Sequence, residues 1–496
     1  MTLVPLDIPA GFYRNGTDLE QSGRWRDGSL VRWRDNSLRP IGGWQERKTS
    51  FCTNVVRGMH TWEANNGTAY AAGGSYNELV AMTGNGTVYD IAPTDLTAGR
   101  EDAEVETGYG YGFYGDGFYG TPIQQNANAV PEEATQWNLD NWGEYLVACN
   151  KDDGRLLEWQ LNPAVKAAPI ANAPTGNLGL VVTEERFIFA LGSGSNPRKI
   201  SWCDRENNTV WTPAATNEAG DIELADSGQI MQGVRTRGQT LILTDTSAHT
   251  ARYLGPPYVY GFERVGTSCG AISRKAASDV DMGVFWMGQR GFFRFDGNSV
   301  QEIPCDVFDY VFGDFNPAQQ SKVWSFANGQ YGEVWWFYCS ENSTEIDRYV
   351  AYDYKEGHWL IGNLSRTSGV QRGVFRYPFM AGHNADSDIY EHEVGLNVDS
   401  SSIFAESGPI SIGAGDQVAR VTELIPDEKT QGDVNVTFKT RLYPNGAETS
   451  HGPFTTANPT SVRFTGRQVR MRVDGAILSD FRVGNMRIDM KAGGRR

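Results

Sequence analysis

Residues 284–298, with the sequence VFWMGQRGFFRFDGN, are the clearest copy of a unit that repeats along the chain. An apolar strand, a Gly-Gln-Arg-Gly turn and a second apolar strand follow one another here, and an Asp-Gly-Asn turn ends the unit. A second copy runs through residues 334–359, and looser copies recur from Val55 to about Tyr390. Short strands at regular spacing, separated by turn residues, are typical of a β-propeller. The pattern predicts an all-β chain with a β-propeller-like domain.

The repeats predict one sheet each. We expect sheets near residues 55–92, 142–170, 179–212, 229–265, 276–304 and 321–362, with a weaker set near 370–392. The strand pattern leaves the count open between six and seven. Aromatic residues make up 12% of the chain, which supplies large side chains to fill the space between neighbouring sheets.

The length of 496 residues predicts more than one domain, because a single core rarely supports so long a chain. Residues 1–50 form an arm in which an Asp35-Asn36 turn predicts a hairpin. Residues 51–398 form the propeller-like domain, with a Gly/Tyr-rich insert near 107–121. In residues 399–496 apolar and polar residues alternate, which predicts an additional C-terminal antiparallel β-domain resembling a sandwich.

The insert consists almost entirely of alternating glycines and aromatics. Glycine brings high chain entropy and no side chain, so we expect the segment to need a partner surface. We predict a loop at an assembly interface; a plain surface loop and a stacking platform for single-stranded nucleic acid stay open as alternatives. The candidate interface residues are Tyr109, Tyr111, Phe113, Tyr114, Phe118 and Tyr119.

The arm contributes four further candidates for an assembly interface, Arg24, Trp25, Arg32 and Trp33. Arginine is dense here although the chain as a whole is acidic. One interpretation is contact with phosphate. We favour the other, in which the arginines stack on tryptophan and pair with acidic partners, within this chain or across a subunit interface.

Composition argues against several kinds of function. The net charge of −16 disfavours a surface that grips a nucleic-acid backbone. The N-terminus lacks the features of a signal peptide, and no apolar run is long enough for a membrane-spanning segment. Six isolated cysteines predict reduced core thiols.

The chain contains no motif that assigns a reaction. G-x-S-x-G, H-E-x-x-H and P-loop patterns do not occur. His383 and His392 lie beside several acidic residues, but at a spacing that matches no metal-ligand template. We therefore predict no catalytic residues, no cofactor and no metal, and we expect that the chain is not an enzyme.

Four stretches, taken in order, resemble the propeller-bearing tail hub or nozzle proteins of short-tailed bacteriophages, also called packaged-DNA stabilisation proteins. These stretches are residues 28–33 (GSLVRW) with 40–44 (PIGGW), residues 112–120 (GFYGDGFYG), residues 200–222, which begin with ISWCD, and residues 466–472 (GRQVRMR) with 481–488 (FRVGNMRI). Together they are spread over most of the chain. The residues concerned are turn residues and aromatics, so their order is more specific than any one of them.

The resemblance implies a homohexameric ring in the tail of the virion, assembled from chains made in the cytoplasm of the host bacterium. Its expected partners are the adaptor and portal-side tail proteins on one side and a distal plug, spike or fibre protein on the other. Genomic DNA would pass through the ring without sequence-specific binding. Two alternatives stay open, namely a tail-associated propeller that binds host glycans and a propeller glycosidase or lyase.

Overall fold

The structure is a computed structural model that describes residues 2–105, 131–226, 228–383, 387–398, 403–412, 417–444, 446–456, 459–475 and 479–494. Their regular secondary structure is almost entirely β-strand. Their helical segments are α1 (Phe308–Gly313) and the 3-10 turns η1 (Ser193–Ser195) and η2 (Pro317–Lys322). No helix in the described part of the chain combines the length and the apolar character needed to cross a membrane.

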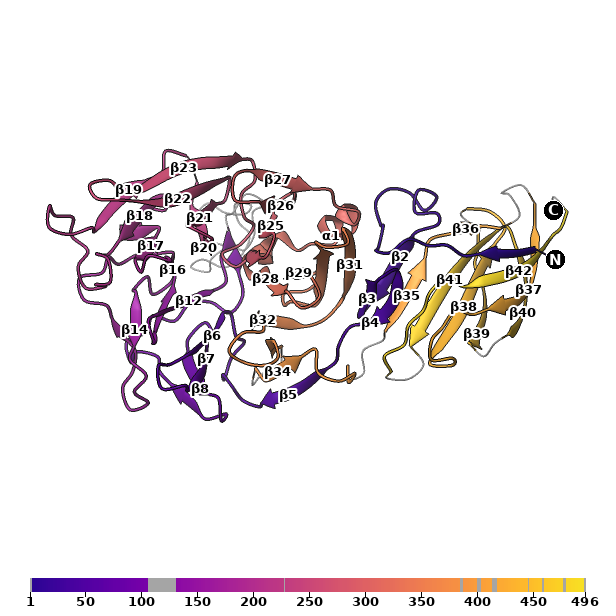
Figure 1. Cartoon of the computed structure of the whole chain (residues 1–496), viewed down its shortest axis with the longest axis horizontal. Coiled ribbons are helices and arrows are strands. Elements are labelled where there is room, and N and C mark those ends of the chain that lie inside the picture. The colour runs from indigo at the N-terminus through magenta and orange to yellow at the C-terminus, as the bar shows by residue number, and fades with distance from the viewer. Residues whose placement is uncertain are drawn as a thin grey trace, which may run out of the picture.

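Seven four-stranded antiparallel sheets form a β-propeller (Figure 1). The first holds β6 (Met59–Glu63), β7 (Ala69–Gly74), β8 (Leu79–Thr83) and β9 (Val88–Asp90). The second holds β12 (Trp137–Trp142), β13 (Tyr145–Asn150), β14 (Leu157–Trp159) and β15 (Ala168–Pro169). The third holds β16 (Gly179–Val182), β17 (Ile188–Leu191), β18 (Lys199–Trp202) and β19 (Gly220–Glu223). The fourth holds β20 (Ile230–Thr236), β21 (Gln239–Thr244), β22 (Ser247–Gly255) and β23 (Val259–Thr267).

The remaining blades complete the ring. The fifth holds β24 (Ala277–Val280), β25 (Gly283–Gly288), β26 (Gly291–Phe295) and β27 (Val300–Ile303). The sixth holds β28 (Trp324–Asn328), β29 (Glu333–Tyr338), β30 (Arg348–Asp353) and β31 (His358–Asn363). The seventh holds β32 (Arg366–Val370), β33 (Phe379–Gly382), β34 (Ile389–His392) and β5 (Trp44–Lys48). The first strand of each blade contacts the first strand of the next all the way round, so these strands surround the propeller axis.

Residues 284–298 show how a blade forms. Residues 284–287 in β25 are buried, and the Gln289-Arg290 turn places Gly288 opposite Gly291 in β26. Trp286 then faces Phe293 across the two strands, with ring centroids 5.8 Å apart. Such cross-strand aromatic pairs fix the register of a hairpin and fill the space between blades. The all-β, propeller-like fold predicted from the sequence is confirmed.

The seventh blade takes its fourth strand from the start of the chain. β5 pairs with β34, and His392 lies opposite Trp44. This pairing joins the two ends of the ring of blades by main-chain hydrogen bonds, and it covers an edge of β34 that would otherwise be exposed. The sequence left the count at six or seven because this blade has only three strands in its own part of the chain.

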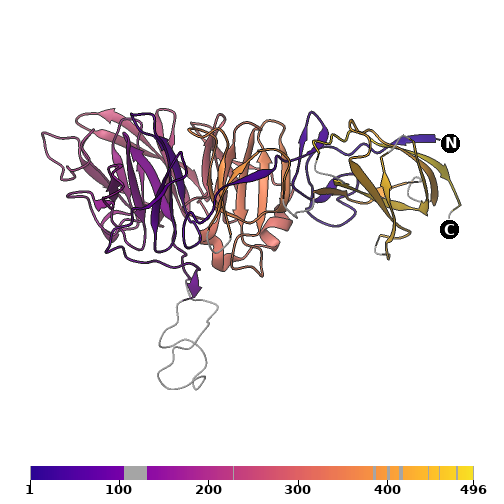
Figure 2. The same ribbon diagram turned by 90° about the horizontal axis from the view of Figure 1, so that it is seen from below.

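The remaining strands form two further sheets and a hairpin. One sheet runs β1 (Thr2–Pro5), β42 (Arg487–Ala492), β37 (Ala419–Ile425) and β40 (Thr460–Gly466). The other runs β2 (Trp25–Ser29), β35 (Phe404–Ser407), β41 (Gln468–Gly475), β38 (Val434–Arg441) and β39 (Thr449–Thr455), with β36 (Ile410–Ser411) beside β41. β3 (Val31–Arg34) and β4 (Ser37–Pro40) form the expected hairpin around Asp35 and Asn36, and β10 (Glu104–Val105) pairs with β11 (Pro131–Glu132). Figure 2 shows the C-terminal sheets beside the propeller, along the long axis of the molecule.

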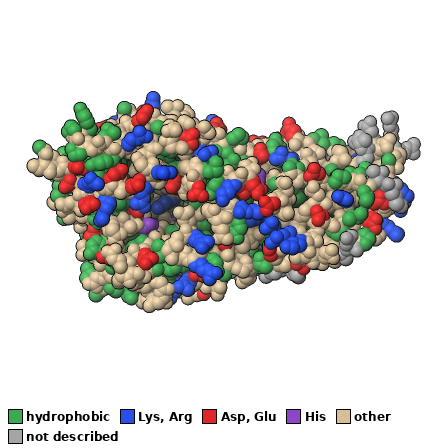
Figure 3. Space-filling view, in the orientation of Figure 1, with side chains coloured by type: hydrophobic (Ala, Val, Ile, Leu, Met, Phe, Trp, Pro, Cys, Tyr) green, Lys and Arg blue, Asp and Glu red, His purple; other side chains and the backbone are tan. Residues whose placement is uncertain are grey.

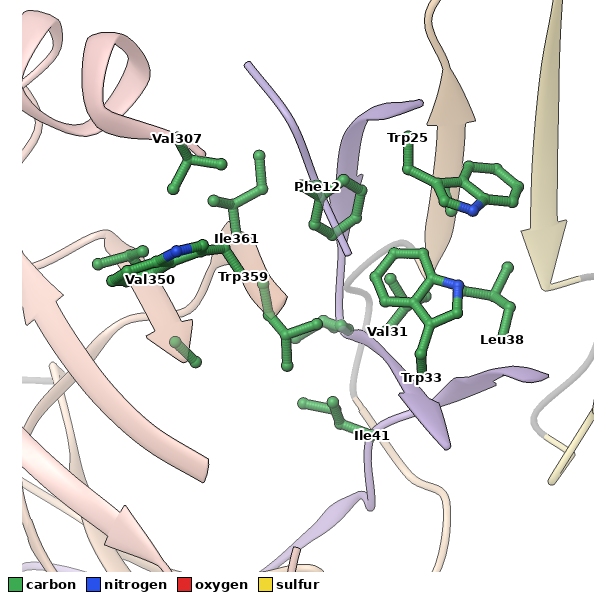
Figure 4. Close-up of a cluster of buried hydrophobic side chains, with 14 of the residues drawn as sticks. Phe12, Trp25, Val31, Trp33, Leu38, Ile41, Val307, Val350, Trp359 and Ile361 are labelled. Atoms are coloured by element: carbon green, nitrogen blue, oxygen red, sulfur yellow. The ribbon is translucent and has the colours of Figure 1, made fainter. Parts of the chain in front are cut away.

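Residues 2–48 belong to both parts of the molecule. β1 and β2 lie in the two C-terminal sheets, whereas β5 lies in the propeller. Between them an apolar core joins the parts (Figure 4), and its labelled side chains are Phe12, Trp25, Val31, Trp33, Leu38, Ile41, Val307, Val350, Trp359 and Ile361. We call this region, where residues 6–44 lie between the sixth and seventh blades and the C-terminal sheets, the junction. One continuous core therefore spans the junction.

Candidate functional site

The predicted interface residues of the insert, Tyr109, Tyr111, Phe113, Tyr114, Phe118 and Tyr119, lie outside the described residues. The four candidates in the arm are described. The side chains of Trp25 and Trp33 are buried in the junction, where their ring centroids lie 5.9 Å apart. Arg24 is half-buried and pairs with Asp306 at 3.3 Å. An assembly role for these residues stays a prediction, and within the chain they connect the arm to its neighbours.

Arg32 is the centre of a buried ion cluster at the junction. Its guanidinium pairs with Glu333 at 2.9 Å and with Glu393 at 2.6 Å, and it stacks on the ring of Tyr331 with its central carbon 3.7 Å from the ring centroid. All three charged side chains are at most 7% exposed. Because the partners come from the sixth blade and from the end of β34, this one arginine ties the arm to two blades. We call Arg32, Glu333 and Glu393 the junction cluster.

The junction cluster has two carboxylates for one cation. Burial and the neighbouring Glu393 raise the pKa of Glu333 to about 7, although Arg32 acts in the opposite direction. The Nε1 group of Trp335 also donates a hydrogen bond to Glu333, at 2.9 Å. Near neutral pH the cluster can therefore accept or release one proton on Glu333.

A second buried ion cluster lies beside the starts of the first strands of two blades. Arg57, just before β6, forms a two-pronged pair with Glu345, and one of its hydrogen bonds measures 2.8 Å. Lys322, at the end of η2, lies 3.4 Å from the same carboxylate and also pairs with Asp102. The side chains of Arg57 and Lys322 are at most 1% exposed. We call Arg57, Lys322 and Glu345 the blade-start cluster.

The blade-start cluster has two cations for one carboxylate, the reverse of the junction cluster. Burial would raise the pKa of Glu345, but Arg57 and Lys322 together lower it to about 2. The contact of Lys322 with Asp102 also fixes the segment that leads into β10. Farther along, the backbone N–H of Ala134 donates to the hydroxyl of Ser321 at 3.0 Å. Both segments that flank the undescribed residues 106–130 are thus anchored on the sixth blade.

The inner strands of the propeller carry a third polar group, which we call the axial cluster: His60, Asp140, Arg235 and Lys275. Figure 3 shows the surface hollowed over the middle of the propeller, with Lys or Arg and His colours inside the depression. His60 lies 3.2 Å from the amide oxygen of Asn141, and Arg235 lies 3.6 Å from Asp140. A carboxylate oxygen of Asp140 accepts the backbone N–H of Val182 at 3.0 Å, which links the second blade to the third.

Two groups of the axial cluster have shifted pKa values. Burial lowers the pKa of Lys275 to about 8, and Asp140 only partly offsets this effect. Burial also lowers the pKa of His60, and the nearby Lys275 and Arg235 lower it further. Near pH 8 the site would therefore present a neutral imidazole and a partly deprotonated amine beside one carboxylate. Such a set can bind an anionic or polar ligand or can transfer protons.

A groove of about 530 Å³ near the fourth and fifth blades is lined by Ser247 and Asp226, and both residues contact His249. Ser247 and Asp226 both approach the Nε2 atom of His249, at 3.0 and 3.1 Å. A nucleophilic relay needs the two partners on different ring nitrogens, so that the histidine can accept the serine proton while the acid orients it. This arrangement therefore does not form a catalytic triad.

The histidines flagged by the sequence do not form a metal site in the described residues. His392 is buried, stacks on Trp44 and accepts a hydrogen bond from Arg366 at 2.9 Å. His383 is instead 4.0 Å from Glu345. All six cysteines are unpaired, and burial raises the pKa of each thiol.

Comparison with known proteins does not identify the family of the chain. No protein family and no curated protein matches the sequence. Virginiamycin B lyase from Staphylococcus aureus is 8% identical with a TM-score of 0.42, and the match covers 70% of this chain and 98% of that one. A streptogramin B lyase is 9% identical with a TM-score of 0.41, covering 71% and 97%. PorZ, a surface component of the type-IX secretion system of Porphyromonas gingivalis, is 8% identical with a TM-score of 0.38, covering 77% and 44%.

One prediction from the sequence is corrected here. We expected that the chain is not an enzyme, and the comparison contradicts that exclusion because the similar structures include lyases. A propeller is a scaffold that supports both catalytic and non-catalytic proteins, so the absence of a sequence motif was an insufficient argument. At this identity the likeness concerns the fold alone and supplies no activity for this chain.

Proposed function

We propose that this chain is a structural subunit of the tail of a short-tailed bacteriophage. In this role it forms the hub or nozzle ring around the DNA channel, retains the packaged DNA and conducts it during ejection. The proposal rests first on the ordered resemblance of residues 28–44, 112–120, 200–222 and 466–488 to such proteins. The physical features of the chain that support it are its internal bracing and its net charge.

The observation that carries the proposal is the way residues 2–48 tie the two parts together. Phe12 donates its backbone N–H to Trp359 in the sixth blade at 2.8 Å, and Leu38 exchanges two backbone hydrogen bonds with Val483 at 2.9 and 3.0 Å. Trp33 and Phe12 pack edge to face between these contacts, 4.9 Å apart. Each such buried aromatic contributes roughly 1.5–3 kcal/mol by removal from water. A subunit braced in this way resists bending, as a ring that retains packaged DNA requires.

Net charge supports a passive conduit. At −16, the chain repels the DNA backbone on average, so a ring of such subunits would let DNA slide past without holding it. Acidic and basic colours are interspersed over the face in Figure 3, which gives DNA no continuous basic track on that face. The ring would present its acidic residues toward the channel.

The mass of the native particle tests this proposal. Purified protein at micromolar concentration, measured by native mass spectrometry, should give the mass of a hexamer. A chain that stays monomeric at the highest soluble concentration contradicts the proposal. Replacing residues 106–130 by a short Gly-Ser linker should reduce hexamer formation if the insert lies at the subunit interface, and its failure to do so would remove that segment from the assembly hypothesis.

The axial cluster favours a second candidate function, a propeller lyase. Lys275, with its pKa lowered to about 8, is suited to abstract a proton from carbon, the step that starts an elimination. The lowered pKa of this amine therefore favours a lyase over a glycosidase, which uses a pair of carboxyl groups.

Competitive acetylation between pH 6 and 11, read by mass spectrometry, tests the axial amine. Lys275 should become reactive with a midpoint near pH 8, because burial disfavours its charged form. The exposed amine of Lys355 is the control for the reagent, and the midpoint of Lys275 should lie below the value of about 10.4 for a solvated lysine amine. If the two lysines become reactive at the same pH, the result contradicts a proton-transfer role for the axial cluster.

A further inference from the structure

The hairpin that joins β30 to β31 brings three ligand-type side chains together at the junction. Asp353 ends β30 and His358 begins β31, and the two residues lie opposite each other in the antiparallel register. Residues directly opposite in such a pair have Cβ atoms about 4.5–5.5 Å apart. Glu356 lies in the turn between them. The backbone thus holds an acid and an imidazole side by side before any metal arrives.

The three side chains converge on one point. A carboxylate oxygen of Asp353, one of Glu356 and a ring nitrogen of His358 all lie within 4.8 Å of one another. Asp353 is 1% exposed and His358 is 6% exposed, so both are almost removed from water. Among the described residues, the Nε2 atom of His358 is buried without a hydrogen-bond partner. No hydrogen bond at Nε2 therefore fixes the tautomer of His358, so Nδ1, the ring nitrogen that faces Glu356, can carry the lone pair that a metal needs.

The arm of the chain orients the third ligand. The backbone N–H of Asp35, at the tip of the β3–β4 hairpin, donates to Oε1 of Glu356 at 3.2 Å. The other oxygen, Oε2, lies 3.9 Å from Nδ1 of His358. Backbone N–H groups of Lys355 and Glu356 donate to Oδ1 of Asp353, both at 2.8 Å, and fix that carboxylate. The positions of both acids are therefore set by main-chain contacts.

We propose that Asp353, Glu356 and His358 bind one divalent transition-metal ion such as Zn²⁺. An imidazole with two carboxylates suits zinc and its neighbours in the first transition row, whereas calcium and magnesium prefer oxygen ligands alone. Small side-chain rotations would bring the donor atoms to the roughly 2.0–2.2 Å that zinc requires. A pocket of about 390 Å³ beside Glu356 and His358 gives water access to the remaining coordination positions.

The site would connect the sixth blade to the arm at the junction. Its ligands belong to the sixth blade, while the contact that positions Glu356 comes from the arm. Bound metal would therefore stabilise the position of the β3–β4 hairpin against the propeller, as any ligand that binds the folded state raises stability. This inference does not depend on the chain forming a ring or on its role in a phage tail.

Zinc binding by the full chain tests the proposal, with Zn²⁺ alone as the probe. Equilibrium dialysis with metal analysis compares the wild type with Glu356→Gln, whose side chain keeps the acceptor for Asp35 but loses its charge. Glu341→Gln, an exposed acid in the preceding turn of the same blade, is the matched control. The wild type and the control should bind one Zn²⁺ more than Glu356→Gln, or bind it at least tenfold more tightly.

Thermal melting gives a second readout. Without metal, Glu356→Gln should melt with the wild type, because Glu356 is partly exposed and its hydrogen bond survives. Added Zn²⁺ should raise the melting temperature of the wild type and the control but not that of the variant. Equal zinc uptake and equal stabilisation in all three proteins would overturn the proposal. Equal stabilisation of the wild type by Ca²⁺ would also overturn it, because the histidine would then contribute nothing.

Discussion

The junction cluster and the blade-start cluster are both buried, yet they shift the pKa of a glutamate in opposite directions. At the junction Arg32 pairs with two carboxylates, and the pKa of Glu333 is raised to about 7. In the blade-start cluster two cations pair with Glu345, and its pKa is lowered to about 2. Burial alone raises the pKa of a carboxyl, so the local count of charges decides the sign. The first cluster is therefore a proton acceptor near neutral pH, and the second is a permanent ion pair.

Removing the carboxylate of the blade-start cluster should have the largest effect. Glu345→Gln leaves the buried cations Arg57 and Lys322 without their shared counter-charge, which should cost about 3–5 kcal/mol in the free energy of unfolding. Urea denaturation at pH 7 measures this change. Glu341→Gln, which alters an exposed acid of the same loop, should stay within about 0.5 kcal/mol of the wild type. A loss below about 1 kcal/mol for Glu345→Gln would show that the cations find other partners.

The pH dependence of stability should separate the clusters next. The folded state holds a proton on Glu333 up to about pH 7, whereas the unfolded chain releases it near 4.5, so this contribution favours folding at low pH and is lost as pH rises between these values. From pH 8 to pH 5 the wild type should gain on the order of 1–3 kcal/mol relative to Glu333→Gln.

Glu345 provides the contrast in the same titration. Its folded pKa of about 2 lies below its ordinary value of 4.5, so its stabilisation is complete above pH 4.5 and is lost as pH falls toward 2. The cost of Glu345→Gln should therefore stay constant between pH 8 and pH 5. If that cost varies over this range while the Glu333 difference does not, the assignment of the two clusters is reversed.

The smallest effect should come from Glu333→Gln at pH 7. Arg32 keeps its 2.6 Å pair with Glu393, and the amide can still accept from Trp335. The wild-type carboxyl is itself about half protonated at this pH, so the change should stay within about 1 kcal/mol. Urea denaturation measures it beside Glu345→Gln. A loss comparable to that of Glu345→Gln would remove the distinction between the clusters.

Local pattern explains what the sequence could predict. Residues 284–298 identified a blade because both strands and their turn are adjacent in the chain, and the same holds for the strands of the first six blades. The fourth strand of the seventh blade could not be predicted in this way, because Trp44 pairs with His392, far along the chain. Arg32 likewise meets Glu333 and Glu393, and nothing near Arg32 in the sequence identifies either partner.

The sites were less predictable than the fold. His60, Asp140 and Lys275 each stand alone in the sequence and come together only because they lie on or next to inner strands of different blades. The pair Asp353 and His358, by contrast, was within reach: a hairpin turn between an acid and a histidine places them opposite each other. The prediction that the chain is not an enzyme was wrong for the reason that hid the axial cluster: residues far apart in the sequence form the sites of a propeller.

We infer that residues 2–48 make the propeller and the C-terminal sheets one cooperative unit, on which the proposed tail role depends. Differential scanning calorimetry of the wild type, Glu345→Gln and Arg32→Ala tests it most directly. We predict a single transition that both substitutions move to lower temperature, although one lies at the blade starts and the other at the junction. Two separate transitions, of which each substitution moves only one, would contradict the claim.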